Sequence, residues 1–141
     1  MPTEVVVDSS IFVSLVTPEE QSAWSSGRMQ RQDYPHVLDL NYYEVANAIK
    51  YKIDGTKFGA KDAVKAFTEA VGLMNLCALH SFSEIVGDAI ALALELDISV
   101  YDAAFLALAE RHHAHLLTLN TKLEKKTAGT KYRNILECPS K

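Results

Sequence analysis

The chain has 141 residues, a length that suits one domain with one core, and we expect residues 1–141 to form that domain. Its hydrophobic share of 48% and charged share of 23% are typical of a water-soluble protein, and no apolar run approaches the ~20 residues of a membrane helix. The N-terminus lacks the pattern of an export signal, so we expect a cytoplasmic protein without membrane association. A net charge of −4 argues against a protein that coats nucleic acid over its whole surface.

The first half of the chain predicts two strands and three helices. Three consecutive valines are typical of a buried strand, and Thr17 and Glu20 match a capping box with Pro18 at the first helical position. Asp54 and Gly55 are typical of a helix end. In chain order we expect a strand at 5–7, an apolar turn at 11–16, a helix from Thr17 to about Ser26, a strand at 36–39, and helices at 40–53 and 59–74.

The second half continues the alternation of strands and helices. Ser81 and Glu84 form one capping box and Thr121 and Glu124 form another, and each predicts a helix start. We expect a strand at 76–79, helices at 82–96 and 101–113, a strand at 116–119, a short basic helix from Thr121, and a strand at 134–136. Such alternation predicts the α/β class, with three α/β/α layers around a central parallel sheet.

Three acids stand in unusual places in this pattern. Asp8 ends the first strand, Glu44 lies within an otherwise apolar helix, and Asp102 is at the head of a helix that is apolar nearly all round. Asn120 ends a later strand, and ligands of parallel sheets bind at the carboxyl ends of strands. A buried carboxylate is costly unless it is neutralised or binds a cation, and clustered carboxylates bind hard divalent cations. The pattern therefore indicates a Mg²⁺ or Mn²⁺ site.

Each acid also has a structural alternative. Glu44 follows Asn41 by three residues, the spacing of an N-cap and its reciprocal glutamate. Asp102 has a favourable interaction with a helix dipole, and Asp8 is able to accept hydrogen bonds from the turn that follows it. Taken singly, these alternatives are as well supported as a metal site; the joint pattern favours the metal.

The segments VVVDSSIFVSLVTPEE, LNYYEVANAI and ALALELDISVYDAAFLALAERHHAHLLTLNTKL resemble the PIN domain, particularly the VapC-type toxins of toxin–antitoxin pairs. The resemblance spans nearly the whole chain. It implies that Asp8, Glu44 and Asp102 bind the metal and that Thr118 supplies a hydroxyl beside them. The chain departs from the family pattern at Asn120, where most relatives carry aspartate. An amide oxygen is still able to bind a hard cation, but it adds no negative charge.

The resemblance also implies an activity and partners. It implies a PIN-like, Mg²⁺- or Mn²⁺-dependent endoribonuclease that cuts RNA, is restrained by a small antitoxin protein and forms a homodimer. We assign catalytic roles to the three acids and Asn120, and supporting roles to Ser9 and Ser10, which stand beside Asp8. The alternative is a catalytically weak or inactive PIN scaffold that binds RNA or a protein without cutting, and Asn120 motivates it.

Two further groups of side chains have competing interpretations. Lys122, Lys125 and Lys126 follow the Asn120 strand and are candidates for RNA phosphate contacts, although charge spacing alone favours an ordinary solvated face. His112, His113 and His115 invite a zinc interpretation, but His112 suits the last turn of a helix and no cysteine has zinc-finger spacing to them. We therefore expect structural roles for these three histidines. The two cysteines, Cys77 and Cys138, are expected to be reduced thiols.

Overall fold

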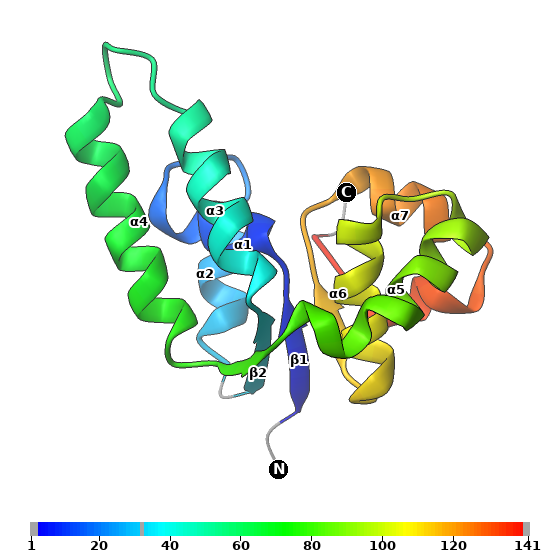
Figure 1. Cartoon of the computed structure of the whole chain (residues 1–141). Coiled ribbons are helices and arrows are strands. Elements are labelled where there is room, and N and C mark those ends of the chain that lie inside the picture. Colours follow the sequence, from blue (N-terminus) through cyan, green and yellow to red (C-terminus); the bar gives the residue numbers. More distant parts are fainter. Residues whose placement is uncertain (1–2, 32, 140–141) are drawn as a thin grey trace.

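The computed structural model describes residues 3–31 and 33–139 of the chain (Figure 1). Within these residues strands and helices alternate, as the sequence predicts. The strands are β1 (Glu4–Val7), β2 (Tyr34–Leu38), β3 (Ala78–His80), β4 (His115–Leu117) and β5 (Leu136–Glu137). The helices are α1 (Ser9–Val16), α2 (Ser22–Met29), α3 (Leu40–Tyr51), α4 (Ala60–Met74), α5 (Phe82–Leu96), α6 (Val100–Arg111), α7 (Thr121–Thr127) and a 3₁₀ helix (Lys131–Ile135).

The five strands form one parallel sheet in the order β3-β2-β1-β4-β5. β1 is central, with Val6 opposite His36 of β2 and Leu116 of β4. Parallel neighbours need crossover connections, and helices supply them. The carboxyl ends of β1 and β4 consequently lie side by side, so that Asp8 and Asn120 follow neighbouring strands.

Helices cover both faces of the sheet, which confirms the three-layer α/β/α prediction. Side chains alternate along a strand, so Val5 and Val7 face one way and Val6 the other. Val5 and Val7 pack in a core with α1, α3 and α4, while Val6 packs in a second core with α5 and α6. Figure 1 shows these two helical groups on either side of β1. The sheet is thus buried on both faces, which explains its valine-rich strands.

The segment after β1 differs from the prediction. Residues 11–16, expected as a turn, belong to α1, because Oδ1 of Asp8 accepts a hydrogen bond from the Ser10 N–H over 3.0 Å and caps the helix. Thr17 ends α1 instead of starting the next helix. Its N–H and hydroxyl both donate to the Val13 carbonyl, over 3.0 and 2.7 Å. Pro18 disfavours a helical conformation at Thr17, so α2 begins only at Ser22.

Several other element boundaries differ from the prediction by one or two residues, and two of these differences have similar local reasons. Asn120, not Thr121, caps α7, because its Oδ1 accepts from the Leu123 N–H over 3.0 Å. The last strand begins at Leu136 rather than 134, since the preceding residues form the 3₁₀ helix. Boundary errors of this kind change the role of single side chains but leave the order of the elements intact.

Cys77 and Cys138 are both free thiols. Burial raises the pKa of Cys77 to about 11, which keeps that thiol protonated and unreactive at neutral pH.

None of the helices in the described part of the chain has the length and apolar character of a membrane-spanning segment.

Candidate active site

A cavity of about 520 Å³ lies at the carboxyl ends of β1 and β4. All three predicted acids line it, and so does Asn120. The other lining residues are Ser9, Ser10, Val13, Glu19, Asn47, Ala48, Lys52, Phe105 and Leu119. The strand order puts β1 next to β4, and α3 and α6 add Glu44 and Asp102.

Asp8 is the most buried acid of the cavity, with 7% of the residue exposed. Burial raises its pKa to about 6, although hydrogen bonds from Ser10 and Thr118 favour the charged form and lower it. The Ser10 hydroxyl donates to Asp8 Oδ1 and accepts from the Leu119 N–H over 3.0 Å. Ser10 therefore ties Asp8 to the end of β4, a supporting position of the kind that the sequence predicts.

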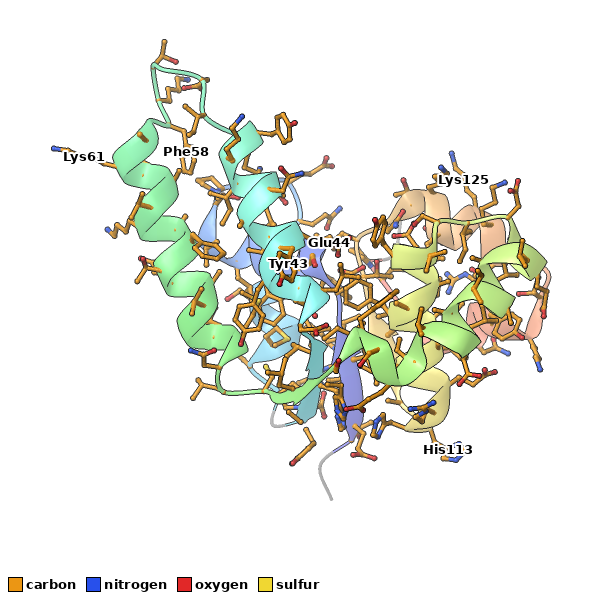
Figure 2. All side chains as sticks on the ribbon, viewed as in Figure 1. Tyr43, Glu44, Phe58, Lys61, His113 and Lys125 are labelled. Carbon is orange, nitrogen blue, oxygen red and sulfur yellow. The ribbon has the colours of Figure 1, made fainter. Side chains whose placement is uncertain are left out.

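Glu44 projects from α3, and Figure 2 shows it on the side of this helix where α6 lies. The Ser9 hydroxyl donates to its Oε1 over 2.8 Å. Burial raises the pKa of Glu44; the Ser9 bond opposes this rise, whereas the negative charges of Asp8 and Asp102 add to it. Each of these acids is thus close enough to make Glu44 harder to ionise.

The structural alternative for Glu44 is wrong. Asn41 does not cap α3; it is fully buried within the first turn, and Oδ1 accepts from the Leu38 N–H over 2.8 Å. Its Nδ2 donates to the Val7 carbonyl over 3.1 Å and to the Ser9 hydroxyl over 3.3 Å. Asn41 therefore links the ends of β1 and β2 and supports the serine that contacts Glu44. Sequence reasoning missed this role of Asn41. The sequence signals it only through a polar residue that lies one helical turn before the partly buried Glu44.

Asp102 lies in the first turn of α6, where its N–H donates to Ser99 Oγ over 3.0 Å. In this position the negative charge of Asp102 interacts favourably with the dipole of α6, as the structural alternative expects. The same position also places Asp102 on the cavity. The three acids share one cavity, but their ligand oxygens do not all come within 4.8 Å of one another. A cation shared by all three therefore requires side-chain movement or bridging waters.

Asn120 also lines the cavity, but its Oδ1 is engaged as the N-cap of α7. Its N–H donates to Oγ1 of the buried Thr118 over 3.0 Å. Glu124, which the sequence relates to Thr121 in a capping box, instead pairs with Arg133 over 3.0 Å. The capping-box assignment of Glu124 is therefore wrong.

None of the three candidate RNA-binding lysines is among the residues that line the cavity. Lys126 pairs with Asp97 over 3.3 Å, and Figure 2 shows Lys125 projecting outward from α7, away from Glu44. Lys52 of the segment after α3 does line the cavity, where it forms an ion pair with Glu19. Asn47 also lines the cavity and was not singled out from the sequence. Its position three residues after Glu44 on the same helix was a signal that both side chains share one face.

Comparison with known proteins identifies the family of the chain. The PIN-domain family model matches residues 5–128. Ribonuclease VapC3 of Pyrobaculum aerophilum is 36% identical over 123 residues, which cover 87% of this chain and 94% of that protein.

Two solved structures have the same fold. One is a toxin-antitoxin complex from Klebsiella pneumoniae, with a TM-score of 0.69, 16% identity and coverage of 97% of this chain and 98% of that chain. The other is VapBC2 from Rickettsia felis bound to a DNA fragment from their promoter, with a TM-score of 0.63, 12% identity and coverage of 98% and 100%. The sequence matches and the arrangement of the acids lead to one conclusion: the chain belongs to the PIN-domain family.

Proposed function

We propose that this protein is a metal-dependent endoribonuclease that cleaves RNA phosphodiester bonds, and that it acts as the toxin of a toxin–antitoxin pair. The observation that carries the proposal is the presence of Asp8, Glu44 and Asp102 on one cavity. The 36% identity to a ribonuclease supports it, because the alignment covers nearly the full length of both chains.

The donor chemistry of the cavity fits Mg²⁺ or Mn²⁺. Its acids offer carboxylate oxygens, the ligands that these hard cations prefer, and Mg²⁺ commonly keeps several waters that bridge to more distant carboxylates. The raised pKa of Asp8 fits as well, since it marks a buried carboxylate with too little positive charge nearby. The positive charge of Lys52 is already balanced by Glu19.

In this proposal Asp8, Glu44 and Asp102 hold the cation. When bound, the cation supplies Lewis acidity, which activates a water for attack on a phosphodiester and neutralises charge on the phosphate. Ser9 holds the Glu44 carboxylate toward the cavity, and Ser10 and Thr118 favour the charged form of Asp8. Asn120 caps α7 and thereby orders the loop between β4 and α7 beside the cavity.

RNA approaches this acidic cavity with the help of lysines that lie outside its lining. Lys122, Lys125 and Lys126 lie on α7, whose N-cap is the cavity residue Asn120. There Lys122 and Lys125 are available to RNA phosphates away from the scissile bond, while Lys126 is paired with Asp97. Such contacts are independent of sequence and weaken with salt.

An antitoxin and a second copy of the chain are the proposed partners, and the cytoplasm is the proposed location. A toxin–antitoxin complex shares this fold over nearly the whole chain. An apolar groove between α3 and α4 offers a surface for the second copy; it is lined mainly by Ala46, Ile49, Ile53, Ala60, Val64 and Phe67. An arginine from the antitoxin is the expected neutralising group at the acidic cavity.

A second candidate function is a PIN scaffold that binds RNA without cutting it. Asn120 favours this candidate, because its side-chain oxygen is used as a helix cap and it brings no charge to the cation.

The deciding experiment measures cleavage of RNA by the purified chain with added Mg²⁺ or Mn²⁺ and with a chelator. We expect metal-dependent cleavage that falls about a hundredfold or more in Asp8→Asn, since this change removes the central carboxylate. Asp97→Asn is the matched control, because the Asp97 side chain is 95% exposed and lies outside the cavity lining. RNA binding without cleavage by the wild type would establish the scaffold, and equal cleavage by both variants would refute the proposed site.

A further inference from the structure

Three histidines from three separate elements meet on the α5 and α6 side of the sheet. One ring nitrogen from each of His36, His80 and His112 lies within 4.8 Å of the other two. Nδ1 of His36 and Nε2 of His80 are 2.8 Å apart, and the His112 ring stacks on His36 with 4.4 Å between centroids. Within residues 3–31 and 33–139, no other three His, Cys, Asp or Glu side chains bring their ligand atoms this close. We name these three residues the histidine cluster.

The fold, rather than a local motif, assembles the histidine cluster. His36 is in the middle of β2, His80 is the last residue of β3, and His112 is the C-cap of α6. Asp102 lies in the first turn of α6, on the acidic cavity, and His112 caps the other end of this helix, so these residues are separated by about 15 Å along the helix axis. The histidine cluster is therefore a site distinct from the acidic cavity.

Glu4 determines which ring nitrogen of His36 carries the proton. Nε2 of His36 lies 3.0 Å from Glu4 Oε1, and an ionised carboxylate only accepts hydrogen bonds. Nε2 of His36 therefore carries the proton, and in the neutral ring Nδ1 presents its lone pair toward His80. Metal-binding histidines are commonly oriented in this way, by a carboxylate that accepts a hydrogen bond from the ring nitrogen that does not bind the metal.

The electrostatic environment favours neutral rings at His80 and His112. Burial lowers the pKa of His80, and the neighbouring His112 and His36 lower it further. The pKa of His112 is lowered by burial and then by His36. Glu4 and Glu84 contribute nearby negative charge, while Arg111, the nearby cation, pairs with Asp88 over 3.2 Å. Neutral imidazole is the form that binds metals.

We propose that His36, His80 and His112 form a Zn²⁺ site, with Glu4 as the carboxylate that orients His36. Three imidazole nitrogens and one water complete a tetrahedral shell at about 2.0–2.1 Å, the geometry of three-histidine zinc sites. The nitrogens of such a shell lie about 3.3 Å apart, so the His36–His80 pair, now 2.8 Å apart, has to open by roughly half an ångström and lose its hydrogen bond. Nitrogens of the cluster that lie up to 4.8 Å apart have to move closer. A bound Zn²⁺ joins β2, β3 and the end of α6 and so stabilises the fold.

The test uses the full-length protein freed of metal with a chelator and then titrated with ZnCl₂ in excess Mg²⁺, so that the carboxylates are occupied. Calorimetry is expected to give one equivalent of Zn²⁺ per chain, with a raised melting temperature. Co²⁺ is expected to give the intense visible absorption of a four-coordinate ion. His112→Ala and His80→Gln should weaken binding at least about a hundredfold, and Glu4→Gln about tenfold or more.

The matched controls are His113→Ala and His115→Ala. Both residues are exposed neighbours of His112 in sequence, and Figure 2 shows His113 projecting away from the molecule. They are expected to leave Zn²⁺ affinity unchanged. The proposal is overturned if the wild type takes up no stoichiometric Zn²⁺, or if His112→Ala and His113→Ala bind equally. Loss of Zn²⁺ binding in Asp8→Asn would overturn it too, by moving the ion to the acidic cavity.

Discussion

The hydroxyl of Ser9 donates a hydrogen bond to Oε1 of Glu44 over 2.8 Å, joining the start of α1 to the middle of α3 across 35 residues of sequence. This bond is the one favourable influence on the charged form of Glu44, whose pKa is raised by burial and by two neighbouring acids. A residue beside the first acid thus favours the charged form of the second.

Ser9→Ala is expected to weaken Mg²⁺ binding by about three- to tenfold at pH values where Glu44 is only partly ionised, because the pKa of Glu44 rises further when the bond is lost. The loss should shrink at higher pH, where Glu44 is ionised in both proteins. Calorimetric titrations with Mg²⁺ across the pH range measure this difference. Ser9→Thr keeps the hydroxyl and should restore affinity; an equal loss in both variants at every pH would show that Ser9 acts through packing instead.

Asp8 is expected to make the metal-free protein less stable as pH rises. Its folded pKa of about 6 exceeds the ordinary value of 3.8, so the unfolded chain releases this proton first. The contribution of protonated Asp8 to the free energy of unfolding is therefore fully present below about pH 4. This contribution is lost as the pH rises through 6, and the free energy of unfolding falls by on the order of 3 kcal/mol. Asp8→Asn removes this dependence, and urea unfolding on both sides of this interval measures it.

The same variant separates charge from packing. Asparagine keeps the acceptor for Ser10, so at neutral pH metal-free Asp8→Asn should be as stable as the wild type or more so. Added Mg²⁺ should then stabilise only the wild type. A large loss of stability in metal-free Asp8→Asn would mean that the carboxylate is chiefly a structural group.

Asn120→Asp is expected to tighten Mg²⁺ or Mn²⁺ binding and to raise cleavage at limiting metal. The change adds a charge at nearly constant volume, and aspartate caps a helix as well as asparagine does. The Coulomb gain is on the order of 4 kcal/mol for a charge 4 Å from a unit cation, before desolvation and repulsion from the other acids reduce it. Calorimetry of both proteins measures the net effect.

Glu124→Gln is the matched comparison for Asn120→Asp. Glu124 pairs with Arg133 and lies outside the cavity lining, so its change should cost a little stability and leave metal affinity unaltered. Unchanged affinity in Asn120→Asp together with a marked loss in Glu124→Gln would assign the fourth acidic role to Glu124.

Val64→Glu is expected to dissociate the proposed homodimer, because Val64 is 68% exposed and lines the apolar groove between α3 and α4. A charge buried at such an interface has no partner to compensate it. Light scattering at micromolar concentration measures the mass. Val86→Glu changes an exposed valine on α5 and is the control; dissociation of this variant alone would place the interface on the opposite side of the sheet.

The sequence by itself determined the layered parallel fold and the three acids of the cavity. Alternating strands and helices leave few topologies, because crossovers between parallel strands follow one handedness and bury both faces of the sheet. Such a sheet brings strand ends together, so Asp8 and Asn120 are predictable neighbours. Glu44 is recognisable as an acid in the middle of a largely apolar helix segment, and Asp102 as an acid at the head of a helix that is apolar along most of its length.

Only the tertiary structure decided how these and other polar side chains pair. The bonds from Asn41 to Val7 and Ser9, from Ser9 to Glu44, and between His36 and His80 join residues that are 32 to 44 positions apart. Periodicity and capping patterns describe interactions over a few residues, whereas these contacts depend on strand register and on where helices meet the sheet. The capping errors have local causes: Asn120 takes a backbone N–H near the start of α7 and caps this helix in place of Thr121, and Thr17 bonds back to the Val13 carbonyl at the end of α1.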